Sequence, residues 1–205
     1  MHFLSEQDKQ RIRDAIQEVE RKTSGELVTV IAHSSDNYAY IPLLWAALLA
    51  LVLPGPFVLA DVWWFLAHSY FYQLGCFIVA ALVFRIPAIR LRLIPATVRR
   101  RRAHRHAMEQ FVLNNLPATQ QANGILLFVS VAEHYVEIIA DKGINDRVPA
   151  NTWVTVVAHF TQQVKNGEIA EGFIEAIHAC GVVLQEHFPA HRDNLDELPN
   201  HLIIV

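Results

Sequence analysis

Two long apolar runs stand in the middle of a chain whose two ends mix apolar and polar residues. They are Ile41–Ala60 and Val62–Phe84, and Asp61 between them carries the one formal charge of the whole stretch. A helix of about 20 apolar residues crosses a bilayer core, where backbone polar groups must be paired within the segment. The pattern therefore predicts a transmembrane helical hairpin over residues 41–84. The alternative is a helical hairpin buried inside a soluble protein.

Arginines follow the second run and predict the side of the membrane on which the polar segments lie. Eight of them fall between Arg85 and Arg105 without a carboxylate, whereas the connection around Asp61 has no Lys or Arg. Basic residues near the ends of spans stay in the cytoplasm. We therefore expect an integral membrane protein with two transmembrane helices and both termini cytoplasmic. Four of the arginines are expected at the membrane surface: Arg99, Arg100, Arg101 and Arg102.

The segment before the hairpin predicts a helix and then a strand. Apolar residues of Ser5–Lys22 recur at helical spacing, as Ile12, Ala15, Ile16 and Val19. Ser5 begins a pattern close to a capping box. The charge density of this segment excludes a signal peptide. The β-branched apolar run Leu27–Ala32 follows and is typical of a strand buried on both faces.

The chain after the hairpin predicts two more strands and three helices. The strands are Gly124–Val131 and Tyr135–Ala140, and the helices are Thr97–Leu116, Thr152–Lys165 and Glu168–Phe188. Three residues between the two strands are too few for a parallel crossover, so the third strand is expected to be antiparallel. Leu202–Val205 are expected to add an edge strand or to lie on the surface. The order of elements predicts an α/β fold with a mixed sheet.

The predicted domain is split by the hairpin, because neither half alone has a closed core. We expect a first part over residues 1–40 and the hairpin over 41–84. A basic juxtamembrane segment and the second part follow over 85–188, and a tail over 189–205. The strand before the hairpin should lie parallel to Gly124–Val131, with Thr97–Leu116 as the crossover helix.

Composition adds two limits to this picture. The 205-residue chain has a net charge of −3, which gives no indication of nucleic-acid binding. Cys76 falls in the second apolar run and Cys180 in a predicted helix. Two cysteines so placed indicate buried thiols rather than a disulfide framework.

Polar residues are expected to meet at one end of the predicted sheet, the end furthest from the hairpin. The candidate metal ligands are Glu26, Asp141 and Asp146, with Asn123 and Gly143 as further ligand-binding positions. Carboxylate, amide and carbonyl oxygens suit Ca²⁺. The same carboxylates could hold a catalytic metal or act as general acid and base. Residue types alone also allow a simpler role, in which the carboxylates cap elements and the glycine makes a turn.

Four segments have a recognisable order and spacing. They are Ser24–Val30, Asn123–Val129, Val136–Gly143 and Gly167–Phe173. Together they resemble the TPM domain family, named for thylakoid-lumen acid phosphatase-like proteins, in a membrane-inserted bacterial-type variant. The resemblance implies a three-layer α/β/α domain, and it implies the calcium binding and weak acid phosphatase activity attributed to some members. The chain departs from the family in lacking the second glycine of the Gly-x-Gly form after Asp141.

Two functions follow from these patterns. The first is a non-enzymatic, membrane-anchored module that binds a protein or an ion at the cytoplasmic membrane face, since no complete set of nucleophile, base and oxyanion donors can be written. The alternative is a metal-dependent acid phosphatase acting on phosphomonoesters. The expected partners are the lipid bilayer and a membrane-associated protein, and the expected cofactor, if any, is Ca²⁺.

Overall fold

The chain forms two compact units in the computed structural model, which describes residues 4–53, 63–119, 121–149, 151–190 and 202–205. One unit combines Met1–Ser35 with Arg102–Val205, and the other is Asp36–Arg101. We call them the α/β unit and the hairpin unit. The connection around Asp61 and most of the C-terminal tail lie outside the described residues.

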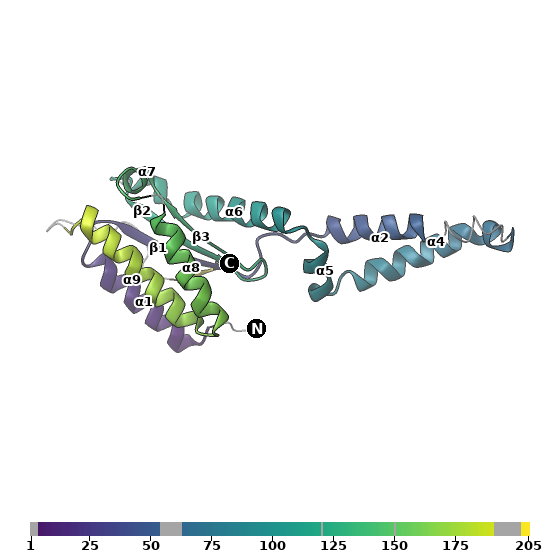
Figure 1. Ribbon diagram of the computed structural model, residues 1–205, viewed down its shortest axis with the longest axis horizontal. Coiled ribbons are helices and arrows are strands. Elements are labelled where there is room, and N and C mark those ends of the chain that lie inside the picture. The colour runs from purple at the N-terminus through teal and green to yellow at the C-terminus, as the bar shows by residue number, and fades with distance from the viewer. Residues whose placement is uncertain (1–3, 54–62, 120, 150, 191–201) are drawn as a thin grey trace. The chain divides into compact units, whose positions relative to one another are not determined.

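A mixed sheet forms the centre of the α/β unit (Figure 1). In the described part of the chain its order is β3-β2-β1-β4, with β1 (Glu26–Ala32), β2 (Gly124–Ser130), β3 (Tyr135–Ala140) and β4 (Leu202–Ile204). β1 runs parallel to β2 and to β4, and β3 runs antiparallel to β2. The predicted pairing of the first two strands across the intervening hairpin is confirmed. The end of the tail supplies the edge strand.

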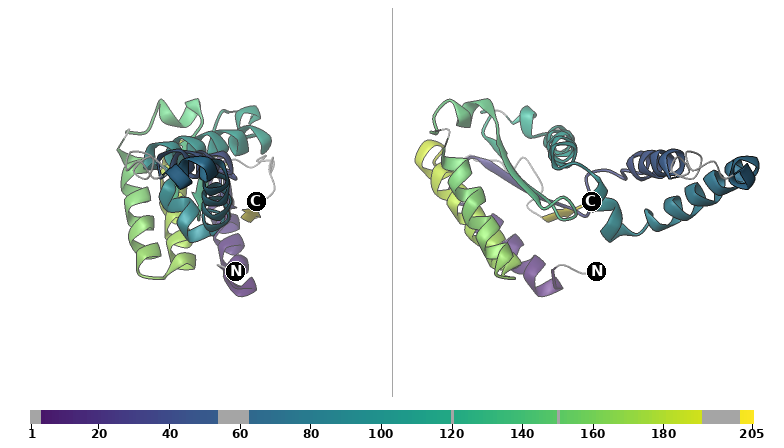
Figure 2. Two further views of the ribbon diagram at one scale, coloured as in Figure 1. Left: turned by 90° about the vertical axis from the view of Figure 1, so that its right-hand side faces the viewer. Right: turned by 45° about the vertical axis from the view of Figure 1, so that its right-hand side comes forward.

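Helices cover both faces of this sheet, as the right-hand view of Figure 2 shows. The helices of one face are α1 (Glu6–Glu20), α8 (Thr152–Lys165) and α9 (Ile169–His187), and α6 (Ala96–Leu113) covers the other. Alternation along β1 produces the two cores, because successive strand residues point to opposite faces. Leu27 and Ile31 join the core with α1 and α9, whereas Val28 and Val30 pack with Ala107 of α6.

Short elements shape the ends of the α/β unit. The 3₁₀ turn η1 (Leu116–Ala118) follows α6, and the single-turn helix α7 (Lys142–Asn145) follows β3. Cys180 is buried in α9, and this burial raises the pKa of its thiol to about 12. The thiol is therefore protonated and inert at neutral pH.

The hairpin unit consists of α2 (Tyr40–Val52) packed against α4 (Trp63–Val83), with the short helix α5 (Pro87–Leu93) at its base. A small core of Tyr38, Ile41 and Ile94 holds the base together. Trp45 Nε1 also donates a hydrogen bond to the carbonyl of Leu93 at 3.3 Å.

The predicted transmembrane hairpin is wrong: among the described residues, no helix combines the length and the apolar character that crossing a membrane requires. α2 has 13 residues, which span about 20 Å against a hydrocarbon core of about 30 Å. Its end agrees with Pro54 in the sequence, since proline disfavours helix at the preceding residue. In α4 the polar side chain of Gln73 interrupts the apolar run. The predicted localisation, an integral membrane protein with both termini cytoplasmic, depended on two transmembrane helices and is therefore also wrong.

Candidate functional site

The predicted polar segments meet at one end of the sheet. The register pairs Glu26 with Gly124, and Asp141 follows directly after β3 on the other side of β2. The amide of Glu26 donates to the carbonyl of Asn123 at 3.3 Å, and the amide of Asp141 donates to the carbonyl of Gly124 at 2.9 Å. The sequence prediction that these residues share one end of the sheet is confirmed.

The side chains at this end hold the backbone of neighbouring loops. Asp141 is the N-cap of α7, where its Oδ1 accepts a hydrogen bond from the amide of Lys142 at 2.6 Å. Asn123 is buried, and its Nδ2 donates to the carbonyl of Ser24 at 2.6 Å. Asn145 Nδ2 donates to the carbonyl of Ala140 at 2.6 Å. Each of these side chains therefore forms a hydrogen bond with a backbone atom at this end of the sheet.

Gly143 allows two backbone segments to approach closely. A Cβ added there would lie 2.6 Å from the carbonyl oxygen of Ala122 and 2.7 Å from that of Gln121. Both are backbone atoms, so no side-chain adjustment would make room. The role of this glycine is therefore steric, and it fits the simpler reading of the predicted site.

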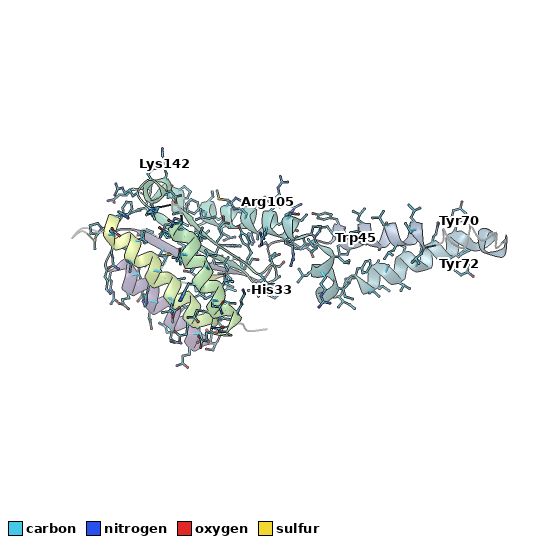
Figure 3. All side chains as sticks on the ribbon, in the orientation of Figure 1. His33, Trp45, Tyr70, Tyr72, Arg105 and Lys142 are labelled. Carbon is cyan, nitrogen blue, oxygen red and sulfur yellow. The ribbon has the colours of Figure 1, made fainter. Side chains whose placement is uncertain are left out.

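The predicted calcium ligands differ in position and in exposure. Asp146 is exposed at the C-terminal end of α7, and Glu26 is buried at the start of β1. Among the described residues, no three His, Cys, Asp or Glu side chains are grouped so that they could hold a metal ion. Lys142, labelled in Figure 3, is exposed and adds a positive charge to this end of the sheet.

A buried polar cluster at the opposite end of the sheet is not predicted from the sequence. Glu133 Oε1 accepts hydrogen bonds from the amide of Ser35 at 3.0 Å and from Ser34 Oγ at 3.2 Å. Its Oε2 accepts from Ser130 Oγ, which also accepts from Ser35 Oγ at 2.7 Å. The cluster ties the loop after β1 to the turn between β2 and β3. Its sequence signal is hydroxyl residues at two strand ends, with a single acid in the connecting turn.

The hairpin unit exposes many large apolar side chains. They lie on α2 and α4: Leu43, Leu44, Leu48, Leu51, Val52, Phe71, Leu74, Ile78, Val79 and Leu82. Tyr70 and Tyr72 of α4 and Trp45 of α2 accompany them (Figure 3). We call this set the apolar hairpin surface. Large exposed apolar patches mark interaction sites in proteins generally.

The same unit carries an excess of positive charge. Residues 36–101 contain six arginines against two aspartates and have no lysine or glutamate. Arg100 and Arg101 at the start of α6 are exposed, and neither forms an ion pair with a described residue. Arg90 lies close enough to Asn37 for a hydrogen bond of 3.4 Å. Apolar surface and unneutralised cations therefore occur together in one unit.

Comparisons with known proteins give a family-model match over part of the chain and a solved structure of similar fold. Residues 89–183 match the family model described as the TPM domain. Among solved structures, the chain is similar to the NMR structure of the BA42 protein from the psychrophilic bacterium Bizionia argentinensis. The TM-score is 0.63 at 23% identity, covering 100% of this chain and 97% of that chain. None of the curated proteins matches.

These findings support the predicted TPM resemblance at the level of domain and fold. They do not support the membrane-inserted variant that the two apolar runs suggested. The chain is thus an α/β protein with a TPM domain match and no function assigned by similarity.

Proposed function

We propose that this protein is a non-enzymatic binding module whose hairpin unit lies on an anionic lipid surface without crossing the bilayer. One observation carries the proposal: the apolar hairpin surface and a cluster of arginines without carboxylate partners occur in the same compact unit. Binding to a lipid surface becomes stronger with the apolar area that is buried there and with electrostatic attraction between basic residues and anionic lipids.

Several apolar side chains of the hairpin unit are largely exposed. Phe71 is 74% exposed, Leu51 69% and Val79 62%. Leaving such side chains in water is unfavourable by about 25 cal/mol for each Å² of apolar surface. Shallow insertion into a lipid surface would remove much of this area from water. Such shallow insertion does not require a helix that is long enough to span the bilayer.

The arginines of the hairpin unit favour an anionic lipid surface. Each Lys or Arg near such a surface contributes on the order of 1 kcal/mol, and salt screens this attraction. Arg99, Arg100 and Arg101 follow one another at the start of α6, and no acid stands among them. Their combined effect should be large at low salt.

The absence of an assembled reaction centre in the described residues favours binding over catalysis. The candidate carboxylates at the sheet end cap α7 or lie apart, and the amide of Asn123 is used by the backbone. No observation favours the metal-dependent phosphatase, so we do not propose it as a second function.

Flotation of the full chain with vesicles tests the proposal. We expect binding to vesicles that contain phosphatidylserine, weaker binding to phosphatidylcholine alone, and release at high salt. Replacing Arg99, Arg100 and Arg101 by Gln should weaken binding on the order of 100-fold at low salt, from three contributions of about 1 kcal/mol each. The matched control replaces Arg13, Arg21 and Lys142 of the α/β unit by Gln and should change little.

A second pair of variants tests the apolar contribution. Leu44→Gln with Leu82→Gln removes two exposed side chains of the apolar hairpin surface. Val154→Gln with Val182→Gln makes the same kind of change on exposed positions of the α/β unit. Only the first pair should reduce flotation. Equal binding to neutral and anionic vesicles, or equal losses from both pairs, would contradict the proposal.

A further inference from the structure

A cavity of about 420 Å³ lies within the α/β unit, on the face of the sheet covered by α8 and α9. Pockets for small molecules occupy roughly 300–1,000 Å³, are mostly apolar and contain a few polar groups. The apolar lining of this cavity comes from the sheet, both helices and the N-terminal segment: Leu4, Ile31, Val129, Phe160, Val164 and Phe173. Its lining includes Ser130 of the Glu133 cluster, but it includes neither Glu26, Asn123 and Asp141 nor any residue of the hairpin unit.

The wall of the cavity is held in place by packing between α8 and α9. Phe160 and Phe173 line the cavity and meet edge to face, with ring centroids 4.9 Å apart. A Cβ at Gly172 would lie 3.2 Å from the Cβ of Gln163, so the two helices approach closely beside the cavity. Apolar side chains around an unfilled space lose dispersion contacts that a ligand could restore.

The charge at the rim selects the kind of ligand. The cavity lining includes Lys165 and His134, and it includes no Asp or Glu. Lys165 is the last residue of α8, is exposed, and forms no ion pair with any described residue. Its ammonium group stands on a flexible four-carbon stem and can reach an anionic group at the mouth. The hydroxyl of Thr161 is already used, since it donates to the carbonyl of Val157 at 2.7 Å.

We propose that this cavity binds a small aliphatic carboxylate, with the hydrocarbon chain among the apolar side chains and the carboxylate beside Lys165. The proposal goes beyond the proposed function, because it assigns a ligand to the α/β unit rather than a surface to the hairpin unit.

Methyl NMR of the full chain, titrated with dodecanoate, tests this site. We expect shifts at the methyl groups of Ile31, Val129 and Val164, and smaller ones at Val79 of the apolar hairpin surface. Dodecanol has the same chain without the carboxylate and serves as the neutral probe. Lys165→Gln should weaken dodecanoate binding about fivefold, the size of one favourable exposed ion pair, and leave dodecanol binding unchanged. Lys142→Gln is the matched control and should leave both unchanged.

A substitution that fills the cavity provides a second test of the ligand site. Val164→Trp places a bulky ring in the lining and should abolish binding of both probes, whereas Val154→Trp on the same helix is exposed and should not. If Val164→Trp does not fold, the comparison of Lys165→Gln with Lys142→Gln decides whether the cavity binds the carboxylate. Shifts confined to the hairpin unit, or equal effects of Lys165→Gln and Lys142→Gln, would overturn the proposal. Neither outcome depends on whether the protein binds vesicles.

Discussion

Thr29 places a hydroxyl group inside an apolar strand. It lies in the middle of β1 and is fully buried, and its Oγ1 has no hydrogen-bond partner among the described residues. A buried polar group without a partner costs about 1–3 kcal/mol of desolvation. Thr29→Val keeps the shape and removes the hydroxyl, so it should raise the free energy of unfolding by about 1 kcal/mol. Urea unfolding followed by circular dichroism measures the change.

The matched control for this prediction is Thr155→Val on α8. Thr155 is exposed, and its Oγ1 donates to the carbonyl of Asn151 at 3.2 Å. Surface changes of this kind usually stay within about 0.5 kcal/mol. A loss of stability in Thr29→Val would show that the Thr29 hydroxyl has a partner in solution. An equal gain in both variants would show that the gain does not come from the burial of this hydroxyl.

Single residues of the candidate site could be located from the sequence more easily than their roles could be assigned. Glu26, Asn123 and Asp141 share one end of the sheet because each stands at a strand end, and strand ends can be predicted from pattern. Whether Asp141 binds an ion or caps a helix depends on α7, whose four residues have no detectable periodicity. Ser35, one partner of Glu133, lies 98 residues earlier in the sequence, in the loop after β1. The sequence shows hydroxyl residues near strand ends and an acid in the turn, but it does not show that they meet.

At the scale of one element, the N-terminal helix α1 begins with a complete capping box. Ser5 Oγ accepts from the amide of Asp8 at 3.1 Å, and the amide of Ser5 donates to Asp8 Oδ2 at 3.1 Å. The hydrogen bond from the Ser5 side chain is the main cause that lowers the pKa of Asp8, followed by the bond from the Ser5 backbone. A carboxylate with a lowered pKa stabilises the folded state above its ordinary pKa, and this stabilisation is lost as pH falls through the lowered value.

Because folding lowers the pKa of Asp8, the stability that its carboxylate contributes depends on pH. Asp8→Asn should be less stable than the unmodified chain at neutral pH, and the difference should shrink below about pH 4, where the unfolded carboxyl takes up its proton. Ser5→Ala should reduce the same pH dependence, because it removes the largest cause of the shift. Urea midpoints between neutral and acidic pH measure both effects. A stability difference that stays constant across this range would show that Asp8 does not titrate differently on folding.

Elements with strong periodicity were predicted well, and those without it were missed. The predicted helix Ser5–Lys22 corresponds to α1, and the first strand is found within a residue of its expected start. The apolar run Ile41–Ala60 predicted a span because hydropathy alone does not place a helix end. In the structure α2 stops at Val52. The apolar run continues in the sequence beyond Val52, so hydropathy overestimates the length of α2.

At the scale of the whole molecule, the order of the sheet follows from the burial of β1. All seven residues of Glu26–Ala32 are buried, so this strand needs neighbours on both edges and helices on both faces. The sequence shows no other strand before the hairpin, so a partner had to come from later in the chain. The parallel pairing with β2 could therefore be predicted. The cavity could not, because its volume depends on the separation between the sheet and α8.

The division into two units leads to a final prediction about folding. Both cores on the two faces of the sheet consist of residues from the α/β unit, and the α6 positions that pack on the sheet, Ala107 and Phe111, follow residue 101. Replacing residues 36–101 by a flexible Gly/Ser linker should therefore leave a folded α/β unit. A shorter loop also lowers the entropy cost of bringing β1 beside β2, although only slowly with length. We expect one cooperative urea transition, with amides of β1 and β2 as protected from hydrogen exchange as in the full chain. Unprotected β1 amides would mean that the hairpin unit supplies part of the core and that the sheet cannot form without it.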